Sequence, residues 1–71
     1  MSEVRSPLQG VVVRVAASTG DDVAEASPVV VIESMKMELS IAAPHGGTVQ
    51  GLDVAVGDKV GLRQVLAEVV A

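Results

Sequence analysis

The chain has 71 residues, a formal net charge of −4, one histidine, and no cysteine, phenylalanine, tyrosine or tryptophan. Neither a disulfide nor a histidine-rich metal site is available to brace so small a domain, so its core must be aliphatic. The acidic balance argues against nucleic acid as a partner, and no apolar run reaches the roughly 18 residues of a membrane span. We therefore expect one small domain, residues 1–71, with no nucleic-acid partner and no membrane partner.

Valine dominates the apolar residues, and β-branched side chains suit a pleated, half-buried surface. No segment is long enough to be the crossover helix that parallel strands require, so an all-β domain with antiparallel pairing is predicted. The N-terminal residues show neither a signal-peptide nor a transit-peptide pattern. Together with the missing cysteine, which fits a reducing compartment, this favours a cytoplasmic location.

Six strands are predicted in chain order, with two shorter ones between them. Asp22-Val23 and Lys59-Val60 are the short segments, and each can complete one of two four-stranded sheets. Ala24-Glu25-Ala26 has the composition of a single helical turn, which the following Ser27-Pro28 would end. The six longer strands are predicted at 3–6, 10–16, 28–34, 37–42, 47–53 and 65–70.

The strands at 28–34 and 37–42 predict a tight hairpin with Met35-Lys36 as its two-residue loop. In that register Ile32 lies opposite Leu39, and the apolar residues of both strands gather on one face. A slip by one residue would scatter them over both faces, so the hydrophobic pattern specifies the register.

The tip of this hairpin departs from ordinary turn chemistry. Two-residue hairpin loops favour Asn-Gly or similar pairs, because both central residues need positive φ. The same register puts Glu33 directly opposite Glu38, and like charges in that position repel. Local inconsistency of this kind concentrates at functional sites. The pattern therefore predicts that Lys36 is displayed for modification, in preference to an ordinary surface lysine on a turn.

The two halves of the chain repeat at a gapless offset of 37 residues, as between Gly20 and Gly57. Each half contains Pro-x-x-Gly, a strand, a Gly-Asp turn and a final strand. Positive φ is expected at both turn glycines, and Asp21 and Asp58 are expected to bond nearby backbone amides. The repeat predicts a pseudo-two-fold axis, sheets that mix strands of both halves, and a lysine tip at the opposite end from the chain termini.

The segment Glu33–Glu38, with its Met-Lys-Met centre, resembles the biotinylation motif of biotin carrier domains of the biotinyl/lipoyl-attachment family. Ile41–Val49 resembles the family's Ala-Pro-x-x-Gly-x-Val stretch, and Val56–Val60 its second Gly-Asp-x-Val turn. The resemblance covers nearly the whole chain and is to the small, thumbless kind. It implies a flattened barrel-sandwich hybrid of two four-stranded antiparallel sheets with pseudo-two-fold symmetry, in agreement with the repeat.

By this resemblance, Lys36 carries covalently attached biotin, and Met35 and Met37 are recognition residues that flank it. Glu33 and Glu38 are expected to be weaker docking groups for the ligase. The implied partners are a biotin protein ligase, a biotin carboxylase and a carboxyltransferase. The implied function is a biotin carboxyl carrier of the acyl-CoA carboxylase type, which moves CO2 between the last two and is not itself an enzyme.

Ala26 and Arg63 depart from the family pattern, in which glycine often occupies the turn before the last strand of each half. Because the two positions correspond under the repeat, the sequence leaves the conformation of both turns open.

Two other functions remain open at this point. A lipoyl-type carrier domain shares the fold and the hairpin lysine, although its tip typically reads Asp-Lys-Ala. A non-modified structural module would share the repeat, but it gives no reason for Met-Lys-Met at the tip. His45 is expected to be a solvated turn residue and Lys59 an unmodified surface charge, and neither suggests a catalytic or metal site.

Overall fold

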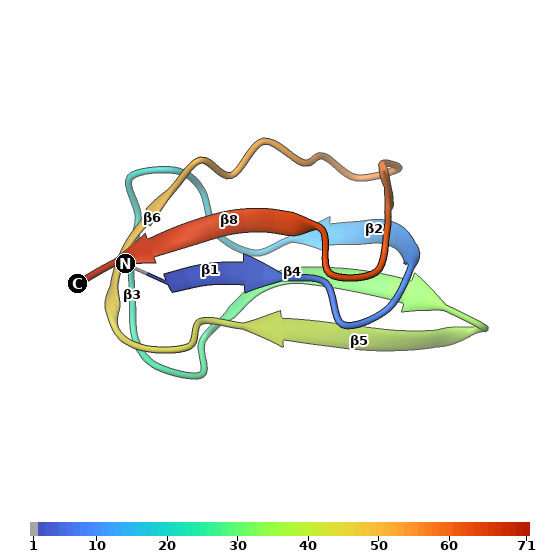
Figure 1. The fold of residues 1–71 in the computed structure, drawn as a ribbon, viewed down its shortest axis with the longest axis horizontal. Helices are drawn as coiled ribbons and strands as arrows, with labels where there is room; N and C mark the ends of the chain where they lie inside the picture. Colours follow the sequence, from blue (N-terminus) through green and yellow to red (C-terminus); the bar gives the residue numbers. More distant parts are fainter. Residues whose placement is uncertain (1) are drawn as a thin grey trace.

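The computed structural model describes residues 2–71, which form eight strands in two four-stranded antiparallel sheets (Figure 1). Met1, the first residue of the predicted domain 1–71, lies outside the described residues. No helix in the described part of the chain is long and apolar enough to cross a membrane. The strands are β1 (Ser2–Arg5), β2 (Gly10–Val15), β3 (Asp22–Val23), β4 (Pro28–Ser34), β5 (Met37–Ala42), β6 (Gly47–Gln50), β7 (Lys59–Val60) and β8 (Val65–Val70).

The sheet order confirms the pseudo-two-fold symmetry that the repeat predicts. One sheet has the order β5-β4-β2-β7 and the other β1-β8-β6-β3. At the repeat offset of 37 residues, each strand of the first sheet corresponds to the strand in the same place in the second sheet. Each sheet therefore contains strands from both halves of the chain.

One aliphatic core lies between the two sheets, and its buried positions also recur at the repeat offset. Fully burying an aliphatic side chain of this size contributes about 1.5–3 kcal/mol, so these residues outweigh local strain elsewhere in the domain. The positions buried in both halves are Val4 with Ile41, Val12 with Val49, Val29 with Leu66, Val30 with Ala67, and Ile32 with Val69.

The two Gly-Asp turns have the same geometry. Gly20 and Gly57 both have a φ of 97°, a conformation that glycine adopts without a steric cost. In each turn the aspartate carboxylate accepts a hydrogen bond from a backbone amide three residues earlier, as expected from the sequence. These bonds join Asp21 to Ser18 (3.0 Å) and Asp58 to Ala55 (2.9 Å).

One of the predicted strands is too long. The strand predicted at 47–53 ends at Gln50, because Gly51 has a φ of 65° and takes the chain out of the ladder. Leu52 and Val54 still pack against the core, but from irregular backbone. The stretch Ala24–Ala26 belongs to a turn and forms no helix.

The molecule is elongated, with extents of 33 × 19 × 18 Å. The β4–β5 hairpin projects from one end, while the two chain ends lie together at the other (Figure 1). The tip of the hairpin and the termini are thus as far apart as the fold allows, as the repeat predicts.

Candidate functional site

The β4–β5 hairpin has the register that the apolar pattern specifies. Ser34 pairs with Met37, and Ile32 pairs with Leu39. This leaves Met35 and Lys36 as the two residues of the loop, with φ angles of 52° and 65°. Both central residues are therefore left-handed, which is the requirement of the tight hairpin turn.

Left-handed backbone is unfavourable for residues with a Cβ, by roughly 1–2 kcal/mol each. The turn persists because the strands that feed it are held firmly. Val30 and Ile32 on β4 are completely buried, and β4 pairs with β5 on one side and β2 on the other. The core thus imposes a conformation on Met35 and Lys36 that their own preferences oppose.

The side chains at the tip face solvent. Lys36 is exposed, and Met35 and Met37 have 92% and 71% of their surface accessible. The ion pair found among residues 2–71, between Arg5 and Glu3, lies away from the hairpin. The primary amine of Lys36 is consequently presented at the apex of the molecule, where another protein can reach it from several directions.

Glu33 and Glu38 form a directly opposed cross-strand pair just below the tip, as expected, and both are exposed. Two carboxylates in this position repel each other. Nothing in the fold requires acidic residues there, so the pair is available to meet a cationic surface.

The start of β2 supports the hairpin from the side. Gly10 lies so close to β4 that a Cβ at this position would collide with the carbonyl oxygen of Glu33. The close approach leaves no room for a side chain at Gly10, next to the pairing of Val11 with Glu33. The sequence shows the glycine within Pro-x-x-Gly but does not reveal what it touches.

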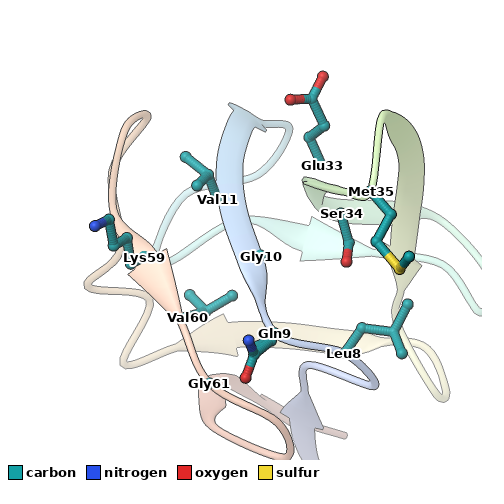
Figure 2. A pocket seen from close by; sticks show the side chains of 10 residues that line it. All are labelled: Leu8, Gln9, Gly10, Val11, Glu33, Ser34, Met35, Lys59, Val60 and Gly61. Carbon is teal, nitrogen blue, oxygen red and sulfur yellow. The ribbon is translucent and has the colours of Figure 1, made fainter.

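A groove lies beside the tip, between β2, β7 and the end of β4 (Figure 2). Leu8, Val11 and Met35 provide much of its apolar lining, and Glu33 and Lys59 also line it. No sequence pattern singled out Leu8 or Val11.

His45 lies in the turn before β6, as expected, but its side chain is only partly exposed and makes a contact across the fold. Its ring is half-buried, with Nε2 2.9 Å from the hydroxyl oxygen of Ser2 and Nδ1 2.8 Å from the Gly46 carbonyl oxygen. The contact with Ser2 ties β1 to the turn before β6. Within residues 2–71, no group of three or more His, Cys, Asp or Glu side chains is arranged to hold a metal ion.

The arrangement fits a prosthetic group that is attached covalently and carried outside the domain. A primary amine can form an amide with a carboxylic acid, and an exposed apex needs no cavity to receive the product. Biotin has the carboxylic acid that such a bond requires. Lys36 is the residue that would hold it, between the exposed side chains of Met35 and Met37.

Comparison with known proteins identifies the family. The family model described as "Biotin-requiring enzyme" matches residues 2–69. The chain is 46% identical over 67 residues to the mitochondrial propionyl-CoA carboxylase alpha chain of Homo sapiens. The matched region is 94% of this chain and 9% of that protein. It is also 44% identical over 57 residues to the biotin carboxyl carrier protein of acetyl-CoA carboxylase of Solanum lycopersicum. Here the matched region is 80% of this chain and 81% of the relative.

The chain therefore belongs to the biotin-requiring enzyme family, as a biotin carrier domain whose cofactor is biotin. It spans only 9% of the length of the human relative. The lipoyl domain of the 2-oxoglutarate dehydrogenase complex of Azotobacter vinelandii superposes with a TM-score of 0.84 at 19% identity, over 100% of this chain and 98% of that domain. That likeness shows the shared fold alone.

Proposed function

We propose that this domain carries biotin as an amide on Nζ of Lys36 and moves a carboxyl group between the active sites of partner enzymes. The observation that carries the proposal is the left-handed Met35-Lys36 turn, which holds one exposed amine at the end of a 33 Å molecule. The names of the relatives, which are carboxylases and a carboxyl carrier protein, support the same reaction class.

Attachment of biotin is an acyl transfer to Lys36. The neutral amine forms a bond to the carboxyl carbon of biotin, which a biotin protein ligase has activated with ATP as a mixed anhydride with AMP. AMP leaves with the bonding electrons, and the amine gives up a proton. A lysine amine is overwhelmingly protonated at neutral pH. The ligase must therefore supply the base that accepts the proton.

The chain contributes position and not catalysis to the reaction that follows. Biotin supplies a ureido nitrogen that holds CO2, and the lysine stem gives this group reach. A stiff hairpin keeps the attachment point far from the chain ends, so that both partner sites meet the group at high effective concentration. We propose that a biotin carboxylase loads the carboxyl group and a carboxyltransferase passes it on, with an acyl-CoA as acceptor, while the domain itself is not an enzyme. The cytoplasmic location expected from the sequence stays a prediction.

A lipoyl-type carrier is the second candidate, because the lipoyl neighbour shares the fold. The Met-Lys-Met tip and the biotin-requiring family match favour biotin. A non-modified structural module would not explain why two left-handed residues are maintained at an exposed apex.

The test is co-expression of the domain with a biotin protein ligase and biotin, followed by intact mass and avidin blotting. We expect one biotin per chain, with the formal net charge falling from −4 to −5 on a native gel. The variant Lys36→Arg keeps the charge and is expected to give no avidin signal, with an unchanged circular dichroism spectrum.

A matched control asks whether any exposed lysine in a left-handed turn is enough. Arg63 is exposed and has a φ of 63°, so the double variant Lys36→Arg, Arg63→Lys offers a second amine in similar backbone. We expect it to stay unlabelled. An avidin signal from either variant contradicts the proposal, and a mass that corresponds to lipoate on the wild type favours the second candidate.

A further inference from the structure

Four exposed residues form a continuous row across the outer face of the sheet that carries the hairpin. Glu38 on β5 lies opposite Glu33 on β4, Glu33 opposite Val11 on β2, and Val11 opposite Lys59 on β7. Directly opposed residues on antiparallel strands point to the same face, and all four are exposed. This docking row (Glu38, Glu33, Val11, Lys59) is acidic at one end, apolar in the middle and cationic at the other end.

The docking row borders the groove beside the hairpin tip. The groove has a volume of about 740 Å³, room for several side chains, and its apolar lining includes Leu8, Val11 and Met35. Figure 2 shows the side chains of Leu8 and Met35 turned toward one another across the end of β4, with Val11 and Lys59 on the other side. All three apolar residues are at least one-third exposed, at 48%, 36% and 92%.

The loop that presents Leu8 is held in place by backbone and side-chain bonds. Ser6 is fully buried, and its hydroxyl donates to the carbonyl oxygen of Leu8. The Ser6 amide also donates to the carbonyl of Gln64 at 2.9 Å, and its carbonyl accepts from the Arg63 amide at 2.7 Å. The groove is thus formed before any partner arrives.

The other sheet provides an internal comparison, because the repeat places an equivalent row there. Val70, Thr48 and Asp22 are cross-strand neighbours on β8, β6 and β3. They correspond to Glu33, Val11 and Lys59. The Thr48 hydroxyl donates to the Asp22 carboxylate at 3.0 Å, so two polar side chains of that row bond to each other. In the docking row, Val11 offers no such bond to Lys59.

The same asymmetry holds for two exposed apolar residues of the groove, Leu8 and Val11. Each has a polar residue one repeat away, so the shared fold does not require an apolar side chain at these positions. An exposed apolar surface that the fold does not need is the kind that marks contact with a partner. The pairs in the groove are Leu8 with His45 and Val11 with Thr48.

We propose that the docking row and the groove seat the biotin protein ligase. Its surface places an apolar side chain in the groove, a cation over Glu33 and Glu38, and a carboxylate against Lys59. This inference rests on the proposed function, since it takes Lys36 as the modified residue. The charge gradient fixes the direction in which the ligase approaches, because opposite orientations would bring like charges together.

The ligase, and not a carboxylase, is the partner that this position favours. The amide bond forms at Nζ of Lys36 itself, so the ligase active site must come down to the hairpin and cover the surface beside Met35. An enzyme that acts on the far end of the attached group can work without touching that surface.

Three variants of the domain test the surface, each with a control that makes the same chemical change outside it. Leu8→Gln, Val11→Thr and Lys59→Glu change the groove and the row. The matched controls are Val56→Gln, an exposed apolar residue outside the groove; Val31→Thr, beside Ser40 on β5; and Arg14→Glu, farther along β2. Circular dichroism and urea unfolding establish that each variant is folded. If Leu8→Gln does not fold, Val11→Thr still tests the groove, because the two side chains of that exchange have nearly the same shape.

The main measurement is kcat/KM for transfer of biotin to the purified apo domain. We expect each surface variant to lower kcat/KM about tenfold, the usual effect of losing an interface side chain that contributes to binding. The controls are expected to stay within about twofold of the wild type. A second measurement uses Lys36→Arg as a bait that binds the ligase without reacting, and the surface substitutions in this background are expected to weaken the complex by the same factor.

Labelling of the surface variants at the wild-type rate overturns the inference while leaving Lys36 as the attachment site. Unchanged ligase kinetics combined with slower carboxylation of the biotinylated domain also overturns it, in favour of a carboxylase. If the wild type takes no biotin at all, the proposed function fails instead, so the two failures are distinguishable.

Discussion

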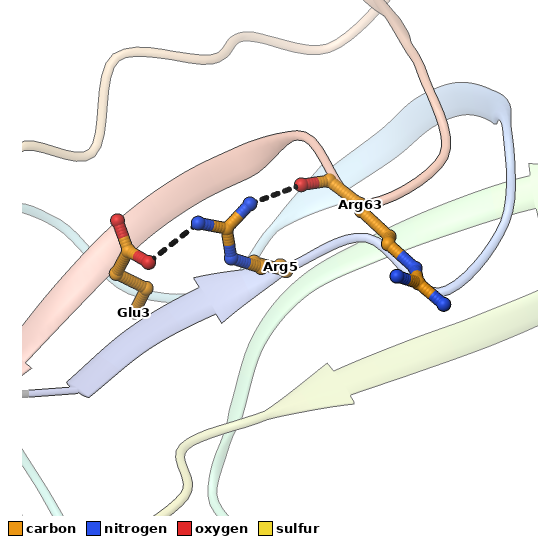
Figure 3. Close-up of polar contacts among 3 residues, drawn as sticks. All are labelled: Glu3, Arg5 and Arg63. Atoms are coloured by element: carbon orange, nitrogen blue, oxygen red, sulfur yellow. Dashed lines mark hydrogen bonds and ion pairs between the residues drawn. The ribbon is translucent and has the colours of Figure 1, made fainter.

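Ala26 and Arg63 occupy equivalent turns one repeat apart, and both have left-handed backbone, with φ angles of 69° and 63°. Each amide donates to a carbonyl just after the end of a distant strand, Ala26 to Ala43 at 2.9 Å and Arg63 to Ser6 at 2.7 Å. The Arg63 carbonyl accepts a further bond from Arg5 at 2.8 Å, and Arg5 also pairs with Glu3 (Figure 3). The turns thus keep the conformation that glycine would favour without having glycine.

Replacing either residue by glycine is expected to stabilise the domain. Ala26→Gly and Arg63→Gly relieve the steric cost of left-handed backbone while keeping the backbone bonds, and we expect a gain of about 1 kcal/mol each. Urea unfolding of the variants measures it. Ala24→Gly, in the same turn but without positive φ, is the control and is expected to lose stability. A loss at both Ala26 and Arg63 would contradict this account of the turns.

A substitution at the tip of the hairpin is expected to raise the stability of the domain while weakening its recognition by the ligase. Met35→Asn places a residue that tolerates positive φ in the first loop position, so the free energy of unfolding should rise by about 0.5 kcal/mol. If the ligase recognises Met35, labelling with biotin should slow in the same variant.

Met37→Asn is the matched control for this exchange. Position 37 is the first residue of β5, where asparagine is disfavoured, so stability should fall and labelling should slow together. A Met35→Asn domain that is labelled as fast as the wild type would show that Met35 is not recognised.

Relief of the repulsion between Glu33 and Glu38 is expected to stabilise the hairpin. Glu38→Lys turns the opposed pair into an attractive one, worth a few tenths of a kcal/mol, and the gain should shrink at high salt. Thermal unfolding at low and high ionic strength measures it. Glu25→Lys makes the same charge change in the turn before β4, and an equal gain there would mean that net charge, and not the pair, is responsible.

Close backbone approach at the two equivalent glycines is expected to make them intolerant of a side chain. A Cβ at Gly10 or Gly47 would collide with the carbonyl oxygen of Glu33 or Val70, so Gly10→Ala and Gly47→Ala should each cost about 1–3 kcal/mol. Gly46→Ala is the control, since the nearest atom lies 3.5 Å from its Cβ position. Urea midpoints that match the wild type at Gly10 and Gly47 would show that the strands can move apart.

Sequence and structure agree most closely at the hairpin and the Gly-Asp turns. The register of β4 and β5, the left-handed pair Met35-Lys36 and the φ of Gly20 all agree with the predictions. These features depend on residues a few positions apart, whose apolar pattern and turn preferences are written directly in the chain. The offset between the halves then gave the symmetry, because two similar sequences bury similar faces.

Other features depended on contacts between distant parts of the chain. The contact of His45 with Ser2 and the close approach of Gly10 to β4 follow from how distant strands pack. No local pattern marks them, since each involves a neighbour that the sequence places far away or a backbone position that only the sheet defines.

By itself, then, the sequence determined an all-β domain with a repeated half, and it identified Lys36 at the tip of a strained hairpin. Only the tertiary structure decided what surrounds that lysine. Lys59 meets Val11 because β7 of one half pairs with β2 of the other, and that pairing exists because the two halves must bury a common aliphatic core. Side chains from four strands reach the same face because of this pairing. No single stretch of the sequence predicts it.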